Sequence, residues 1–200
     1  MVRLFYYKMK SQLKRGQFSL SEQEVTQLLM NTQGFRDRVI LKCLYFGGMR
    51  VSEVAGLRVE NINFERKTIQ IFGKGKKTRV IPFIDLNFYL DLKQFVGERK
   101  QGDVFDVKKR MIQIICQRAG EEAKLSNPCS ELKHINAHLL RHSIARYLKA
   151  HGYPMEFVQN FLGHSQMATT SDTYGTIGLH EMQMIIAAKK QDDNLLPMIK

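Results

Sequence analysis

The sequence predicts a mainly α fold with a small antiparallel β-hairpin, an α+β arrangement, on three observations. Apolar residues recur at helical spacing through much of the 200-residue chain. Two short runs, 68–72 and 79–83, instead alternate between apolar and polar residues, and a turn rich in glycine and lysine joins them. An apolar fraction of 44% is enough to build one substantial core. We expect a basic arm or linker over 1–18, a folded domain over 19–178 and a tail over 179–200.

The first two helices are the easiest to place. Ser19 or Ser21 is a good N-cap for a helix over 22–30. The stretch 35–46 is apolar nearly all round, which predicts a central buried helix that Gly47 and Gly48 end. Further helices are expected over 52–57, 85–96, 107–122 and 138–151, from Pro154 to Gly163, from Ser165 to Tyr174, and over 179–190.

The charge of the chain predicts a polyanionic partner. Lys and Arg total 31 against 19 acidic residues, which gives a net charge of +12 and a pI near 9.7. A field of this sign attracts phosphates and releases their counterions on contact. We therefore expect a nucleic acid as partner, and a basic protein without one is the alternative.

The cysteines and the apolar runs limit the class of protein. Cys43, Cys116 and Cys129 form no CxxC pair, which argues against a disulfide scaffold and against a zinc site built on cysteine. The first residues lack the apolar stretch of a signal peptide, and no apolar run approaches the ~20 residues of a membrane helix. We expect a soluble cytoplasmic protein that does not associate with membranes.

The helix over 138–151 carries the first candidate residues. His138, Arg141 and His142 share one face of it, opposite an apolar stripe that should enter the core. His138 and His142 have the spacing of a zinc site, but Leu139 stands where an HExxH motif has its glutamate, so we expect no metal. Taken alone, this face is better explained as a solvated basic surface than as a catalytic site.

Three further motifs lie elsewhere in the chain. Arg50 follows the Gly47-Gly48 turn, where it can pair with Glu53 or reach a phosphate beside a helix end. His164 lies between a helix stop and a helix start, and Tyr174 follows ten residues later; alone, each could simply pack. The hairpin turn carries four basic residues, which are Lys74, Lys76, Lys77 and Arg79. Basic side chains on an exposed turn usually point into solvent or contact backbone phosphates.

Taken together, the motifs resemble those of the tyrosine recombinases, the phage-type integrases and Xer-type chromosome resolvases. The matching stretches are GGMRVSEVAGL from Gly47, IFGKGKKTRVIPF from Ile71, HLLRHSIARYL from His138 and FLGHSQMATTSDTY from Phe161. They occur in the family's order and spacing, between about Ser19 and Tyr174. The resemblance implies the family's catalytic-domain fold over 19–178.

The resemblance also implies the roles of individual residues. Arg50 and Arg141 match the two catalytic arginines, and Lys74 matches the catalytic lysine. Tyr174 matches the nucleophile, which forms a 3′-phosphotyrosine while a 5′-hydroxyl leaves. The remaining matches are His138 in the HxxR pair, His164 as the third basic residue and Glu53 as the acid that braces the site. We also expect DNA contacts from Lys76, Lys77, Arg79 and His142.

The implied activity is cleavage and rejoining of double-stranded DNA without ATP, metal or other cofactor. The implied assembly is a homotetramer on paired DNA sites and a monomer in isolation. The resemblance favours exchange of the apolar stripe of 179–200 between subunits, and packing of the stripe on its own domain is the alternative. A type IB topoisomerase and an inactive or regulatory DNA-binding relative are the alternatives. The target sequence is not predictable, nor is the outcome of recombination.

This sequence departs from the family pattern in two places. Ala137 stands before His138, where the family often has proline, and the gap from His164 to Tyr174 is ten residues where many members have nine. The family usually adds an N-terminal DNA-clamping domain, for which the stretch before Ser19 is too short. An excised catalytic fragment and a minimal form are both compatible with this length.

Overall fold

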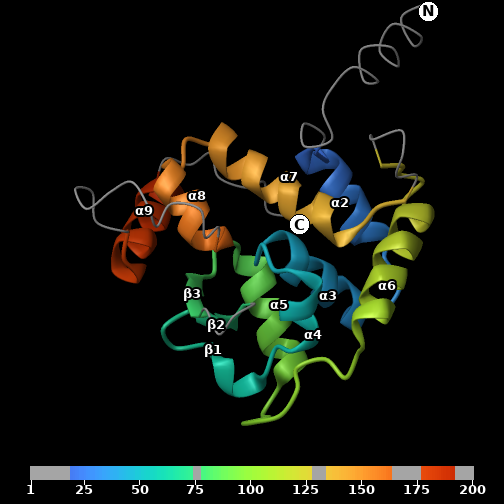
Figure 1. Ribbon diagram of the computed structural model, residues 1–200, viewed down its shortest axis with the longest axis horizontal. Coiled ribbons are helices and arrows are strands. Elements are labelled where there is room, and N and C mark those ends of the chain that lie inside the picture. The colour runs from blue at the N-terminus through green and yellow to red at the C-terminus, as the bar shows by residue number, and fades with distance from the viewer. Residues whose placement is uncertain (1–18, 74–77, 128–133, 164–176, 192–200) are drawn as a thin grey trace, which may run out of the picture.

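The computed structural model describes residues 19–73, 78–127, 134–163 and 177–191, and it shows a mainly helical domain with a small antiparallel sheet at one side (Figure 1). The helices are α2 Glu22–Asn31, α3 Phe35–Tyr45, α4 Val51–Ala55, α5 Leu86–Val96, α6 Lys109–Glu122, α7 Ala137–Ala150, α8 Met155–Leu162 and α9 Leu179–Gln191, with a 3-10 turn, η1, at Val59–Asn61. The strands are β1 Ile62–Asn63, β2 Thr68–Phe72 and β3 Thr78–Pro82. The predicted α+β class is confirmed.

Helix α2 begins at the predicted N-cap. The Ser21 hydroxyl accepts a hydrogen bond from the backbone N–H of Glu24, and the Glu24 carboxylate accepts one from the N–H of Ser21 at 2.8 Å. This reciprocal capping satisfies backbone donors that the helix itself leaves unpaired. The N–H of Leu20 donates to the hydroxyl of Ser143, which ties the start of the described chain to α7.

Helix α3 is the centre of the core, as its all-round apolar sequence predicts. Val39, Ile40 and Leu41 have no exposed surface, and the helix contacts α5 on one side and α7 on another. A helix that is buried on every side needs apolar residues on every side. Its end at the Gly47-Gly48 turn places the following residues at the boundary between core and surface.

The sheet has three strands rather than the two predicted. Its order is β1-β2-β3, with both pairs antiparallel, and Ile69 pairs with Ile62 on one side and Ile81 on the other. Strand β3 begins at Thr78, one residue before the expected start, because Thr78 pairs with Phe72 across the hairpin. Helices α8 and α9 both contact β3 (Figure 1).

The tail helix α9 packs on its own domain in this single chain. Met182 and Ile186 are buried, and the amide of Gln183 donates to the backbone carbonyl of Arg66 at 3.0 Å. The apolar stripe predicted for the tail is therefore covered in cis here. Exchange between subunits stays a prediction.

Two of the cysteines are free and buried in the core. Burial raises the pKa of the Cys116 thiol to about 12 and that of Cys43 still further. A thiol held in its protonated form by apolar surroundings is a poor nucleophile. Cys129 lies outside the described residues. Within the described ranges, no helix is long and apolar enough to cross a membrane.

Candidate active site

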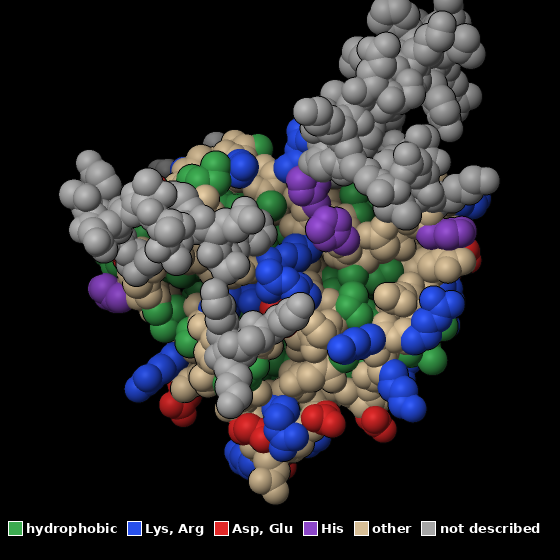
Figure 2. Space-filling model, viewed as in Figure 1, with side chains coloured by type: hydrophobic (Ala, Val, Ile, Leu, Met, Phe, Trp, Pro, Cys, Tyr) green, Lys and Arg blue, Asp and Glu red, His purple; other side chains and the backbone are tan. Residues whose placement is uncertain are grey.

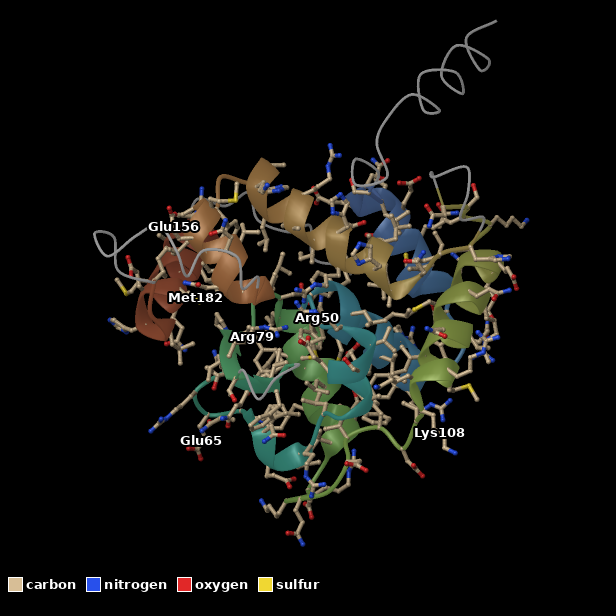
Figure 3. All side chains as sticks on the ribbon, in the orientation of Figure 1. Arg50, Glu65, Arg79, Lys108, Glu156 and Met182 are labelled. Atoms are coloured by element: carbon tan, nitrogen blue, oxygen red, sulfur yellow. The ribbon has the colours of Figure 1, made fainter. Side chains whose placement is uncertain are left out.

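Four segments that are distant in the sequence meet at one point on the surface. They are the turn that follows α3, the body of α7, the end of α8 and the start of β3. Figure 3 shows Arg50 and Arg79 side by side near the centre of this face. All four segments carry motifs that the sequence singled out separately.

The carboxylate of Glu53 is the hub of the cluster. Its Oε1 accepts hydrogen bonds from Arg50 Nη1 and Arg79 Nη1, both at 2.8 Å. Its Oε2 accepts from the backbone N–H of Arg50 at 2.8 Å and from Arg79 Nη2 at 2.9 Å. Four donors fill the acceptor capacity of a carboxylate, which has about four lone-pair sites. The Glu53 carboxylate therefore holds Arg50 and Arg79 with its lone-pair sites filled.

The ionisation of Glu53 follows from these partners. Its side chain is 1% exposed, and burial alone would raise its pKa. The hydrogen bonds and positive charges of Arg79 and Arg50 outweigh burial and lower the pKa to about 2. A buried carboxylate is retained as an anion where such pairing compensates the loss of water. This fits the bracing role that the resemblance implies for Glu53.

Arg50 begins α4 and faces the surface. Besides Glu53, its Nη2 lies 3.4 Å from the carbonyl oxygen of Gly163, and 43% of its side chain is exposed. The sequence left open whether Arg50 pairs with Glu53 or aims at a phosphate. In the structure one edge of the guanidinium is fixed by Glu53, and the exposure leaves room for a ligand.

Arg141 is buried, although helix periodicity placed it on the face turned away from the core. Its Nη1 donates to the carbonyl of Gly48 and its Nη2 to the carbonyl of Leu162. Burial and the nearby charges of Arg50 and Arg79 lower its pKa to about 10, with Glu53 acting in the opposite direction. The turn after α3 and the end of α8 cover this face of α7, which local periodicity does not reveal.

The cluster therefore gathers three guanidinium groups around the single carboxylate of Glu53. Figure 2 shows Lys and Arg side chains at the centre of this face, with histidine side chains beside them. Excess positive charge in a partly dry setting is suited to a phosphate group, and arginine can bind two phosphate oxygens at once. The geometry suits binding of a phosphodiester.

The two histidines of the HxxR helix differ in exposure. His138 lies in the first turn of α7 and is exposed, and His142 is half-buried one turn later. The side chain of Asn136 accepts from the N–H of Leu139 and caps the helix. The other predicted residues lie outside the described residues, namely Lys74, Lys76, Lys77, His164 and Tyr174.

The described residues on either side of the segment 164–176 both lie at α8. Gly163 ends α8 with φ +66° and has its carbonyl near Arg50. The amide of Asn160 donates to the carbonyl of Ile177 at 3.1 Å. Gly163 therefore lies beside the arginine cluster, and Ile177 is hydrogen-bonded to the same helix.

The role of Arg79 within the protein was missed from the sequence. Its position in the GKGKKTR turn predicted a DNA contact, but the contacts found for it are to Glu53 and to the carbonyl of Phe161. Strand alternation offered a signal, because Arg79 shares a face with buried Ile81 while exposed Val80 points the other way. DNA contact by Arg79 stays a prediction.

Within 19–73, 78–127, 134–163 and 177–191, no three His, Cys, Asp or Glu side chains come together to hold a metal ion.

Comparison with known proteins assigns the family. The model of the phage integrase family matches residues 18–177. The chain is 33% identical over 166 residues to tyrosine recombinase XerD of Pasteurella multocida, and 36% identical over 149 residues to tyrosine recombinase XerC of Corynebacterium glutamicum. These matches cover 76% and 68% of this chain but 55% and 45% of the relatives. The chain thus spans about half the length of the curated relatives it matches.

Solved structures share the fold. An integrase from mycobacterium phage Brujita matches with a TM-score of 0.69 at 20% identity, over 84% of this chain and 57% of that one. The XerH site-specific recombinase bound to its difH substrate matches with a TM-score of 0.61 at 25% identity, over 74% of this chain and 47% of that one. With these matches and the family model over most of its length, the chain belongs to the phage integrase family of tyrosine recombinases and contains their catalytic domain.

Proposed function

We propose that this chain is the catalytic part of a site-specific DNA recombinase, which cleaves and rejoins DNA strands through a 3′-phosphotyrosine. The observation that carries the proposal is the cluster of three guanidinium groups braced by Glu53, with Arg50 partly exposed. A site of this kind stabilises the charge that develops on the non-bridging oxygens of an attacked phosphodiester. Family membership supplies the reaction class.

In the proposed reaction, the arginines hold the scissile phosphate. Arg50 has an exposed edge, and Arg141 has five N–H donors of which its two carbonyl partners use two. Preorganised donors of this kind contribute about 3–4 kcal/mol each to stabilisation of the transition state. Since the arginines supply positive charge at the phosphate, we propose a reaction that uses no metal.

Bond making and breaking fall to residues assigned by the family motifs, of which Tyr174, Lys74 and His164 lie outside the described ranges and His138 lies in α7. The Tyr174 hydroxyl oxygen attacks phosphorus and loses its proton to a base, for which we propose His138. The bond from phosphorus to the 5′ oxygen breaks, and Lys74 donates a proton to that oxygen. His164 is proposed as a further hydrogen-bond donor to the phosphate. The phosphotyrosine conserves the energy of the broken bond, so rejoining needs no ATP.

Double-stranded DNA is the proposed partner, with contacts also from Lys76, Lys77 and His142. The relatives support this: XerH has been solved with its difH substrate, and a λ integrase dimer with a core DNA site. We further propose a tetramer on paired sites and a monomer in isolation. We also propose that the protein acts in the cytoplasm of its cell.

A nicked suicide substrate tests the proposed function. Cleavage near the nick releases a short strand that diffuses away, so the enzyme stays covalently attached to the DNA. We expect an adduct that survives denaturation and runs with the mass of protein plus DNA. Binding to the substrate without an adduct would indicate an inactive DNA-binding relative. Relaxation of supercoiled plasmids lacking any recombination site would indicate a topoisomerase.

A further inference from the structure

Arg79 is a nearly buried arginine with an unusually complete set of partners. Only 12% of its side chain is exposed. Its Nη1 and Nη2 bind the two oxygens of Glu53, at 2.8 and 2.9 Å, and its Nε donates to the carbonyl of Phe161 at 3.0 Å. All three nitrogens of the guanidinium are therefore committed to protein groups.

The ion pair between Arg79 and Glu53 fixes the orientation of the carboxylate. A fork that binds both oxygens at once fixes the carboxylate plane, which a single hydrogen bond cannot do. The same oxygen that accepts from Arg79 Nη1 also accepts from Arg50 Nη1. The direction in which Arg50 points is thus set by a carboxylate that Arg79 holds in place.

Arg79 also fixes the second partner of Arg50. Through Phe161 it holds the last turn of α8, and that helix ends at Gly163, whose carbonyl lies beside Arg50 Nη2. The fit is close: a Cβ on Gly163 would lie 2.9 Å from Arg79 Cδ. Gly163 thus lacks a side chain where the arginine passes, and it also has a positive φ of +66°.

We propose that Arg79 is a positioning residue, which holds Glu53 and the end of α8 so that Arg50 faces the scissile phosphate, and that it makes no contact with DNA. The inference rests on the proposed function for the identity of the phosphate. It replaces the DNA contact that the hairpin sequence predicts for this residue. A residue of this kind acts through Arg50 and touches no reacting atom.

The test compares four variants of the whole chain with the wild type. Arg79→Met removes the guanidinium at similar length, and Arg79→Lys keeps the charge without the fork. Glu53→Gln and the Arg79→Met/Glu53→Gln double variant test whether Arg79 acts through the carboxylate. The matched control is Arg66→Met, which removes an exposed arginine from the turn between β1 and β2 of the same sheet.

Two quantities are measured on a nicked suicide substrate: the rate of adduct formation at saturating DNA, and the affinity at several salt concentrations. We expect Arg79→Met to slow adduct formation on the order of 100-fold, the effect of misplacing a reacting group by about 1 Å. The slope of log K against log salt stays that of the wild type. A direct phosphate contact would instead reduce that slope by about 0.9, and this result would overturn the proposal.

The other variants sharpen the assignment. Arg79→Lys has an intermediate rate, because an ammonium cannot span both carboxylate oxygens and the Phe161 carbonyl together. In the Glu53→Gln background, removal of Arg79 slows adduct formation far less than it does in the wild type, because the carboxylate that Arg79 holds is already gone. Full additivity of the two changes, or a rate for Arg79→Met equal to that of the Arg66→Met control, contradicts the proposal.

A measurement that does not depend on catalysis distinguishes failure of this inference from failure of the proposed function. Loss of Arg79 removes two of the four donors to Glu53, which raises the folded-state pKa of that carboxyl toward its unfolded value, so less folding stability is lost as pH falls from 4.5 toward 2 than in the wild type. Chemical denaturation between pH 2 and pH 6 measures it. An unchanged profile overturns the bracing role of Arg79 even if adducts form, whereas a wild-type chain that forms no adduct overturns the proposed function alone.

Discussion

Arg141 donates a hydrogen bond to the carbonyl oxygen of Gly48, which lies 93 residues earlier in the chain. This contact joins the HxxR helix to the turn that presents Arg50, and a second one joins it to Leu162 at the end of α8. Two motifs that the family resemblance supplies separately are thereby parts of one hydrogen-bonded unit. A substitution at Gly48 should therefore displace the arginines, although Gly48 itself has no side chain that could take part in the reaction.

Gly48→Ala is predicted to disable cleavage beyond its effect on folding. Gly48 has φ +54°, a conformation that costs a residue with a Cβ about 1–2 kcal/mol, and the new Cβ would lie 2.7 Å from Leu162 Cδ2. Relief of this clash requires either Gly48 or Leu162 to move, and each of these residues carries a carbonyl that Arg141 binds. The rate of adduct formation per folded molecule, with the folded fraction taken from circular dichroism, measures the effect.

Gly102→Ala is the matched control for that prediction. Gly102 also has a positive φ, of +101°, but a Cβ there meets no atom within 4 Å. We expect both variants to lose stability and Gly48→Ala alone to lose its rate. Equal rates in the two variants would show that the turn does not position the arginine cluster.

Acid should destabilise the protein through Glu53. The folded-state pKa of Glu53 is lowered from 4.5 to about 2, so the stabilisation is fully present above pH 4.5 and is lost as pH falls toward 2. A shift of this size corresponds to roughly 3 kcal/mol. In Glu53→Gln this part of the pH dependence disappears, and chemical denaturation at a series of pH values measures it.

The neutral variant also leaves three arginines without their counter-charge. We expect Glu53→Gln to be less stable than the wild type at pH 7 by about 3–5 kcal/mol, the usual cost of breaking a buried ion pair from one side. Equal stability of the two proteins at pH 7, or an unchanged acid profile, would mean that Glu53 does not brace the cluster.

The sequence predicts most helices because their information is local. The capping residue Ser21 and the stop at Gly163 are read directly from residue type, and both occupy the expected positions. Strand β1 escaped prediction because two residues carry no periodicity, and only pairing with β2 defines it. Ile62 and Asn63 form a strand only through their pairing with Ile69 and Thr68 of β2.

The candidate site, too, could be predicted only in part from the sequence. The sequence motifs indicate which residue types carry the chemistry, but not which groups Arg141 or Arg79 bind. Those partners are the carbonyls of Gly48, Leu162 and Phe161, and backbone carbonyls leave no trace in residue identity. Burial of Arg141 likewise depends on two segments remote in the sequence, so helix periodicity alone placed it on the wrong face.

Lys74 is predicted to be the general acid, rather than Lys76 or Lys77. Its place between Gly73 and Gly75 lets the turn approach DNA closely. A substrate with sulfur at the 5′ bridging position has a leaving group that needs no proton. It should restore cleavage by Lys74→Ala and fail to restore cleavage by Arg141→Ala, as measured by adduct formation. If the sulfur substrate leaves Lys74→Ala inactive, another group protonates the leaving oxygen.

Removal of the tail helix is predicted to destabilise the isolated monomer. Met182 and Ile186 of α9 are buried, the helix contacts β3, and burial of an apolar side chain contributes about 1.5–3 kcal/mol. Deletion of 179–200 should lower the denaturation midpoint, and deletion of 192–200 is the control that keeps α9. Unchanged stability together with weaker assembly on paired sites would instead support a tail docked in trans.

The identity of the nucleophile tests the account most directly. A denatured adduct formed on a nicked suicide substrate is digested with a protease, and the peptide attached to DNA is identified by mass spectrometry. Tyr147 is a useful contrast, because its ring is buried in α7 and stacks on His151. We predict attachment at Tyr174, with no adduct from Tyr174→Phe and unchanged DNA binding. Attachment at Tyr147 or any other residue, or an adduct that persists in Tyr174→Phe, would contradict the account.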